Sequence, residues 1–154
     1  MNTTTDPRKF PFPPGIPAAG LLIGWLLGKL WHFPLSLPAW TRWVEWLLFI
    51  IAPCLTAWAL LTFRHHKTVV DPRGKVVTIV TAGPYRFTRN PMYVSLMLLY
   101  IAGTLAIGNL WVAILLVPVF LALNNGVIGP EERYLQAAFG EQYTSYQSRV
   151  RRWI

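Results

Sequence analysis

The sequence predicts an all-α, polytopic integral membrane protein with about four transmembrane helices, a helical hairpin and a cytoplasmic amphipathic C-terminal helix. The first observation is composition: of 154 residues, 54% are hydrophobic and 13% charged, with a mean hydropathy of +0.40. A soluble domain carries about 25% charged residues. The second is that long apolar runs alternate with short polar connections, and the third is that positive charges gather in a few of those connections. The length fits a single membrane domain, residues 1–154.

The first apolar run, residues 17–33, is just long enough to cross a hydrocarbon core of about 30 Å. Gly20, Gly24 and Gly28 recur in it at every fourth position. This spacing gives a helix one smooth face, and such faces let membrane helices approach closely. We therefore interpret the glycines as a helix-packing surface.

The second run, residues 43–63, completes an N-terminal helix pair that covers residues 1–63. Tryptophans at its start are typical of an interfacial aromatic belt, and Glu45 is expected to reach the lipid headgroups there. Pro53 predicts a kink, which neighbouring helices tolerate in a bilayer. Cys54 is the single cysteine, so an internal disulfide and most metal clusters are excluded, and we expect a buried, inert thiol.

The third and fourth runs, residues 92–107 and 110–128, predict the helical hairpin. Gly108-Asn109 between them is a turn signal. Gly129-Pro130 is expected to interrupt the fourth run, and residues 131–146 then show the pattern of an amphipathic helix. The loop, hairpin and final helix together make the second part of the domain, residues 64–154.

The net charge of +8 is explained mainly by membrane topology. Positive residues concentrate near the N-terminus, in the loop 64–90 and in the tail from Arg133 onward. By the positive-inside rule these segments, with both termini, are cytoplasmic. The same residues attract anionic lipid headgroups. No soluble basic domain is present, so nucleic acid is a poor partner, and no metal site is expected. The compact size suggests the plasma (inner) membrane of a microbe.

The segment 83–93 is the first candidate for chemistry. Two prolines at its spacing do not fit inside one regular helix, so it predicts a shaped loop that leads into a helix at Pro91. Arg86 and Arg89 would then lie at a membrane boundary beside two tyrosines. Guanidinium groups in that position suit a carboxylate or phosphate ligand.

The adjacent acids Glu131 and Glu132 are the second candidate. They follow Gly-Pro at an expected helix start, where the helix dipole favours acids, and this alone would explain one of them. The chain has only six acidic residues, however, and ionisable groups at membrane depth usually have partners or functions. Because the hairpin returns the chain to its starting face, we expect the loop and the acidic pair to meet there.

These motifs, in this order, resemble the isoprenylcysteine carboxyl methyltransferase and phospholipid methyltransferase superfamily. The likeness covers about residues 60–154. It consists of Gly-Pro-Tyr-Arg-Phe-Thr-Arg-Asn-Pro-Met-Tyr at 83–93, the hairpin, Glu-Glu-Arg-Tyr-Leu at 131–135, Phe-Gly-Glu-Gln-Tyr at 139–143 and the closing Arg-Val-Arg-Arg-Trp-Ile. Single pieces such as Arg-Asn-Pro are weak signals, whereas the ordered set is specific.

The resemblance implies an integral membrane methyltransferase that uses S-adenosylmethionine near the cytoplasmic face. Arg89 and Glu132 would be the catalytic residues. Carried over by motif position, the cofactor site would comprise Gly83, Pro84, Tyr85, Arg86, Arg89, Asn90, Pro91, Tyr93, Glu131, Glu132 and Leu135. Many family members have histidine at the position of Asn90, and asparagine can form hydrogen bonds but cannot titrate.

The acceptor is expected to be lipophilic and to enter from the bilayer. The carboxylate of a prenylcysteine-like substrate needs no general base, whereas a phospholipid amine must lose a proton, for which Glu131 or Glu132 is a candidate. Two other readings stay open at this point. One is a relative of membrane sterol reductases that uses a nicotinamide cofactor, and the other is a non-catalytic membrane module that packs or binds lipids.

Overall fold

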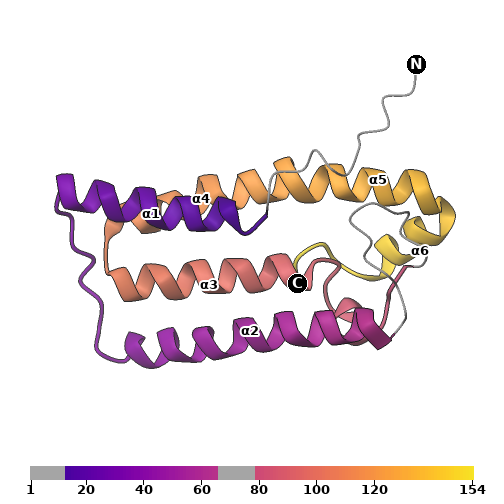
Figure 1. The fold of residues 1–154 in the computed structure, drawn as a ribbon, viewed down its shortest axis with the longest axis horizontal. Coiled ribbons are helices and arrows are strands. Elements are labelled where there is room, and N and C mark those ends of the chain that lie inside the picture. The colour runs from indigo at the N-terminus through magenta and orange to yellow at the C-terminus, as the bar shows by residue number, and fades with distance from the viewer. Residues whose placement is uncertain (1–12, 66–78) are drawn as a thin grey trace, which may run out of the picture.

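In the computed structural model, which describes residues 13–65 and 79–154, four apolar helices lie side by side along one axis (Figure 1). They are α1 (Gly15–Leu30), α2 (Thr41–His65), α3 (Pro91–Ile107) and α4 (Leu110–Leu123). In the described ranges the only β-pairing is a single bridge between Pro34 and Asn109. The predicted all-α class is therefore confirmed.

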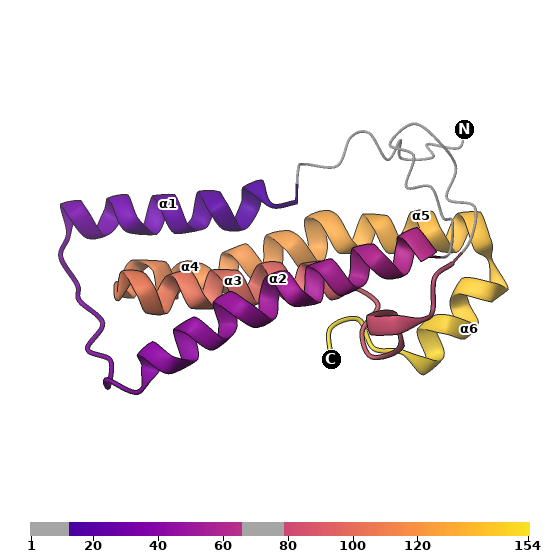
Figure 2. The same cartoon turned by 60° about the horizontal axis from the view of Figure 1, so that its bottom comes forward.

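The α3–α4 hairpin forms the centre against which the first two helices pack. The most extensive contacts join α2 to α3 and α1 to α4, and Figure 2 shows α1 and α2 diverging from one another. The core lies between the hairpin helices and includes Tyr100, Val112 and Leu123, all fully buried. The Tyr100 hydroxyl donates to the Val112 carbonyl at 2.9 Å, so its polar atom is satisfied inside this core.

The glycine face of α1 packs directly on the hairpin. Gly20, Gly24 and Gly28 are all buried. A β-carbon on Gly24 would lie 2.8 Å from the Val112 α-carbon, and one on Gly20 would lie 2.5 Å from a Val119 methyl group. Only glycine allows this closeness of approach, as the packing interpretation required.

Two helical stretches are long and apolar enough to cross a membrane by length and composition. They are α2, with 25 residues, and the 30 residues Leu110–Phe139 that begin with α4. The helices α1 and α3 are apolar but have 16 and 17 residues, whereas about 20 residues span a bilayer core. The arrangement with four crossings stays a prediction. Residues 1–12 and 66–78, with the predicted cytoplasmic cations they contain, lie outside the described residues.

The expected interruption at Gly129-Pro130 is wrong. The helix continues from α4 through a π-helical turn, η3 (Asn124–Ile128), into α5 (Gly129–Phe139). Proline normally clashes with the carbonyl four residues earlier. In the π-helical turn the Gly129 N–H bonds instead to the Asn124 carbonyl, five residues back, and this shifted register allows Pro130 to occupy the first turn of α5.

The amphipathic helix expected over residues 131–146 is divided in two. Gly140 has φ +53° and ψ −126°, a conformation that residues with a β-carbon rarely adopt, and it separates α5 from α6 (Glu141–Arg149). The chain turns sharply there, as Figure 2 shows, and α6 returns toward the start of α3. This return carries the last residues of the chain back across the end of the bundle.

Two expectations for α2 are also wrong, for a shared geometric reason. Its buried residues, Glu45, Ala52 and Ala59, recur every seven positions and form the stripe that faces the bundle. Cys54, two residues after Ala52, falls on the opposite side and is exposed, not buried. Glu45 does not extend outward to headgroups. The residue is 6% exposed, and its Oε2 atom lies 3.8 Å from Arg42 Nη1.

Candidate functional site

Three segments that are distant in sequence meet at the end of the bundle where α3 begins. The first is the loop that contains a 3₁₀ turn, η2 (Gly83–Arg86), and ends at Asn90. The second is the first turn of α5, which carries the two adjacent acids. The third is the tail 150–154 that follows α6. The predicted meeting of the loop with the acidic pair is therefore present in the structure.

Glu132 is the centre of this cluster. Its side chain is buried, with the residue 6% exposed, and it lies between two guanidinium groups. Arg89 Nη2 is 3.1 Å from Glu132 Oε1. On the other side, Arg152 donates from both Nε, at 3.1 Å, and Nη2 to Glu132 Oε2. A buried carboxylate requires such partners, because desolvation of an unpaired charge is costly.

Two buried polar atoms in the cluster have no hydrogen-bond partner. They are Arg89 Nε, a donor, and Glu132 Oε1, an acceptor. The contact of Oε1 with Arg89 is close enough for charge attraction, but its geometry is not that of a hydrogen bond. Buried polar groups nearly always form hydrogen bonds. A donor and an acceptor without one, on two side chains that are in contact, could therefore form hydrogen bonds to a polar ligand.

Glu131 is held separately from Glu132. The Tyr93 hydroxyl donates to Glu131 Oε2 at 2.8 Å, which links the first turn of α3 to the first turn of α5. Tyr143 of α6 is 2% exposed beside the same cluster. Burial, followed by the negative charge of Glu132, raises the pKa of Tyr143 to about 12, so its phenol is neutral at physiological pH.

The loop is fixed by hydrogen bonds to the tail and to α6. The Arg152 carbonyl accepts from Thr88 Oγ1 at 3.1 Å and from Asn90 Nδ2 at 3.0 Å. The Arg89 N–H donates to the Arg151 carbonyl at 2.9 Å. The Tyr146 hydroxyl donates to the Tyr85 carbonyl at 2.7 Å. The Asn90 side chain is thus already engaged in holding the tail.

The remaining residues of the predicted site differ in how deeply they are buried. Pro84, Tyr85 and Pro91 are buried in the loop and at the start of α3. Gly83 has φ +58°, and a β-carbon there would lie 2.4 Å from Thr62 Oγ1 of α2, so the loop needs glycine at this point. Leu135 is partly buried on α5, whereas Arg86 is exposed. The structure does not bring Arg86 into the buried cluster.

Sequence reasoning missed the residues that connect the tail to the site. Arg152 and Trp153 belong to the closing Arg-Val-Arg-Arg-Trp-Ile of the resemblance, but neither is among the site residues predicted from the sequence. In the structure, Arg152 Nη1 and Trp153 Nε1 both donate to Asn124 Oδ1, at 3.2 and 3.0 Å. The position of the Arg-Arg-Trp run at the end of a recognisable motif series was the available signal.

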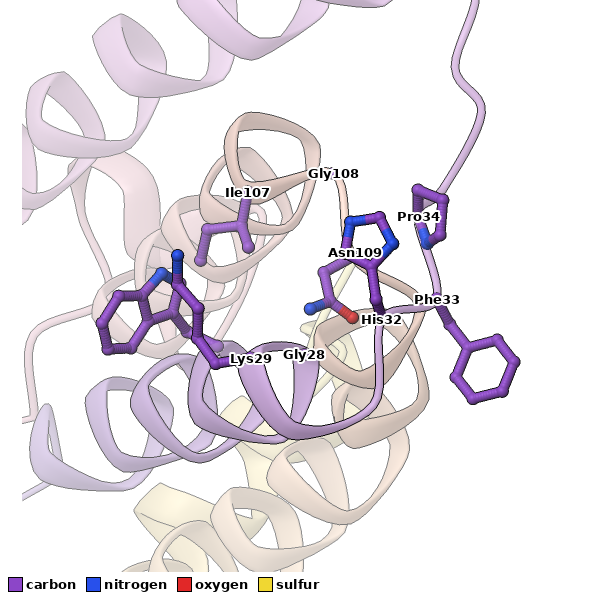
Figure 3. A pocket seen from close by; sticks show the side chains of 9 residues that line it. Gly28, Lys29, His32, Phe33, Pro34, Ile107, Gly108 and Asn109 are labelled. Carbon is purple, nitrogen blue, oxygen red and sulfur yellow. The ribbon is translucent and has the colours of Figure 1, made fainter.

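A separate cavity of about 170 Å³ lies at the other end of the bundle, between the end of α1 and the turn that joins α3 to α4. Figure 3 shows Lys29, His32 and Asn109 among the side chains that line it. None of the site residues predicted from the sequence is among them. The cavity is therefore distinct from the charged cluster.

Known proteins resemble parts of this chain. The family model described as phospholipid methyltransferase matches residues 40–142, more than half of the chain. An uncharacterized protein of Haemophilus influenzae is 40% identical over 65 residues, which are 41% of this chain and 100% of that protein. The protein-S-isoprenylcysteine O-methyltransferase of Schizosaccharomyces pombe is 30% identical over 89 residues, 58% of this chain. The chain covers only 37% of that enzyme, and the family match ends before Arg152.

Proposed function

Because this chain belongs to the phospholipid methyltransferase family, we propose that it is an integral membrane methyltransferase that uses S-adenosylmethionine and acts on a lipophilic acceptor. The observation that carries the proposal is the pair of guanidinium groups, from Arg89 and Arg152, around the buried carboxylate of Glu132 at the end of an otherwise apolar bundle. Ionised groups in such a place need a polar ligand or a partner to offset desolvation. Two of its buried atoms, Arg89 Nε and Glu132 Oε1, form no hydrogen bond within the protein.

The unpaired atoms fit the amino-acid end of S-adenosylmethionine. That end carries a carboxylate and an ammonium group, and the cluster offers one buried donor, Arg89 Nε, and one buried acceptor, Glu132 Oε1. When bound, the cofactor supplies a methyl group made electrophilic by a positively charged sulfur. The protein's part is to bind, orient and exclude water, and most of the rate would come from alignment of the methyl group with its acceptor.

We propose that the rest of the predicted set, apart from Arg86, lines the same site. We assign the wall of the cofactor site to the loop residues Gly83, Pro84, Tyr85, Asn90 and Pro91, together with Tyr93, Glu131 and Leu135. Arg86 is exposed, which suits contact with an acidic headgroup of the acceptor at the entrance better than contact with the cofactor.

A carboxylate acceptor, as in a prenylcysteine-like substrate, is the reaction that the site supports best. Methylation of a carboxylate releases no proton, so no base is required, and Asn90 cannot serve as one. Burial of Glu132 and of the loop residues Pro84 and Tyr85 would keep water away from the reacting groups. The acceptor would reach the site from the bilayer.

A phospholipid amine is the second candidate acceptor, and the description of the matching family favours it. An amine must lose a proton during methylation. Glu131 is the residue placed to receive it, because it lies beside the site and its carboxylate is oriented by the 2.8 Å hydrogen bond from Tyr93.

We also propose that the site faces the cytoplasm, with four membrane crossings and both termini on that side, in the inner membrane of a microbe. The basic tail residues next to the site support this orientation through the positive-inside rule. Positive residues beside the site would also draw it toward anionic lipid headgroups.

The decisive experiment is binding of S-adenosylhomocysteine to purified protein by calorimetry, with Glu132→Gln and Arg89→Ala as test variants. Loss of a charge-assisted hydrogen bond is worth about 1.5–3 kcal/mol, which corresponds to about a tenfold to hundredfold weaker affinity. Glu141→Gln is the matched control, because Glu141 is an exposed acid at the start of α6. Equal affinities in all four proteins would remove Arg89 and Glu132 from the site.

The same protein can distinguish the other functions. Binding of a nicotinamide dinucleotide phosphate in place of S-adenosylhomocysteine would indicate the reductase reading, and no adenosyl binding at all would favour a non-catalytic module. Lipids from native membranes incubated with methyl-tritiated cofactor would identify the acceptor. A base-labile methyl ester indicates a carboxylate, whereas a base-stable label indicates an amine.

A further inference from the structure

We propose that Arg152 is a positioning residue of the methyl-donor site and that the C-terminal tail is a structural part of that site. The inference rests on the proposed function and assigns a role to a segment that lies beyond residue 142, where the family match ends. It names Asn124, on the π-helical turn, as the anchor that holds Arg152 in place.

The first reason is how Arg152 holds Glu132. Its Nε and Nη2 atoms both donate to the same carboxylate oxygen, Oε2. The other oxygen, Oε1, is left as the buried acceptor without a hydrogen bond. Arg152 therefore fixes the rotation of the carboxylate and determines that Oε1 is the oxygen that faces Arg89.

The second reason is that Arg152 is itself held from behind. Asn124 Oδ1 accepts from Arg152 Nη1 at 3.2 Å and from Trp153 Nε1 at 3.0 Å. The Trp153 ring packs on Phe120, with 4.9 Å between ring centroids. A π-helical turn changes the direction of side chains relative to a regular helix and is frequent at functional sites. Here that turn begins at Asn124.

The third reason is that the tail backbone holds the cationic loop as well. The Arg152 carbonyl accepts from Thr88 and Asn90, and the Arg151 carbonyl accepts from the Arg89 N–H. Residues 151 and 152 of the tail therefore hold Arg89 and the residues that flank it, Thr88 and Asn90, and the side chain of Arg152 also holds Glu132. The spacing between the unpaired donor, Arg89 Nε, and the unpaired acceptor, Glu132 Oε1, depends on this connection.

The charges agree with this role. Two guanidinium groups face one carboxylate, so Arg152 can balance Glu132 while Arg89 keeps attraction for an anionic group of a ligand. Without Arg152, Arg89 would be the only cation paired with Glu132 among the residues that the structure describes, and it would be drawn fully onto the carboxylate.

The test compares Arg152→Gln with Arg151→Gln in the full-length purified protein. The two arginines are adjacent and carry the same charge, but the Arg151 side chain is exposed. We expect Arg152→Gln to weaken S-adenosylhomocysteine binding by about tenfold to a hundredfold and to raise KM for the methyl donor, with little effect on KM for the acceptor. Arg151→Gln should bind as the unchanged protein does. Arg152→Lys, which keeps the charge but not the fork, should recover part of the affinity.

A second variant and a double-mutant cycle separate positioning from general stability. Asn124→Leu removes the anchor and leaves Arg152 in place, so it should weaken donor binding in the same direction. Combining Arg152→Gln with Glu132→Gln should cost little more affinity than Glu132→Gln alone, because Arg152 acts through that carboxylate. Additive losses, or equal increases in both KM values, would indicate a structural role and overturn the proposal.

The outcomes for the two proposals can be distinguished. If the unchanged protein binds S-adenosylhomocysteine and both Arg152→Gln and Asn124→Leu bind it equally well, the positioning role is wrong while the proposed function stands. If the unchanged protein does not bind it, both are wrong.

Discussion

Replacing Gly24 by alanine should destabilise the bundle, although alanine is the better helix former. The new β-carbon would lie 2.8 Å from the Val112 α-carbon and 2.8 Å from its Cγ2. Val112 is fully buried, and its backbone belongs to α4, so neither atom can move aside without displacing a helix. Overpacking of this kind costs about 1–3 kcal/mol, and the helix propensity of alanine returns about 1 kcal/mol. The net loss is therefore about 0–2 kcal/mol, and the clash with backbone atoms of Val112 places it toward the upper end of that range.

For a chain of this length, a loss of about 2 kcal/mol, the upper end of that range, lowers the melting temperature by about 4–8 °C. Thermal unfolding of the purified protein in detergent, followed by circular dichroism, measures the shift. Gly126→Ala is the matched control, because a β-carbon there meets nothing within 4 Å and the φ angle is not positive. It should leave the melting temperature unchanged or raise it slightly. A Gly24 variant as stable as the Gly126 variant would refute the packing of α1 on α4.

Two further predictions concern other parts of the bundle. Ser95→Ala should lower the free energy of unfolding by about 1 kcal/mol. Ser95 is 1% exposed, and its hydroxyl donates to the Ala52 carbonyl at 2.6 Å and accepts from the Thr56 hydroxyl at 2.7 Å. An unchanged unfolding transition would contradict this link between α2 and α3. Stability should also fall between pH 10 and pH 12. The pKa of Tyr143 is raised to about 12 by burial and then by Glu132, whereas an unfolded tyrosine ionises near 10. Its contribution is therefore complete below pH 10 and is lost as the pH rises through the folded value. Tyr143→Phe should reduce that slope in melting temperatures measured across the window, and an unaltered slope would show that other groups cause it.

The four apolar helices were predictable because each apolar run has the length and composition of a helix in a membrane. The turn at Gly108-Asn109 was also predictable, since glycine supplies the left-handed conformation, φ +59°, that ends α3. The continuation through Gly129-Pro130 was not, because a local proline signal cannot show that a π-helical turn will absorb the register shift. The division at Gly140 was missed for a similar reason, since the surrounding residues keep an amphipathic pattern across it.

The candidate site was predictable in part. Arg89 and Glu132 were identified from residue type and order, and the structure pairs them at 3.1 Å. The exposure of Arg86 could not be derived, because a short turn places consecutive side chains in different directions. The partners of Arg152 could not be derived either, because Glu132 and Asn124 are 20 and 28 residues away and α6 must reverse the chain to bring them together.

The sequence by itself determined that this is a bundle of apolar helices with a basic loop and an acidic helix start at one end. Those features follow from hydropathy, helix-breaking residues and charge order, which act locally along the chain. Only the tertiary structure decided that the tail closes the cluster, that one oxygen of Glu132 is left without a hydrogen bond and that α1 and α2 pack on the hairpin. These contacts depend on which side chains, distant in sequence, are brought into the same small volume, and that is determined by the packing of the whole chain.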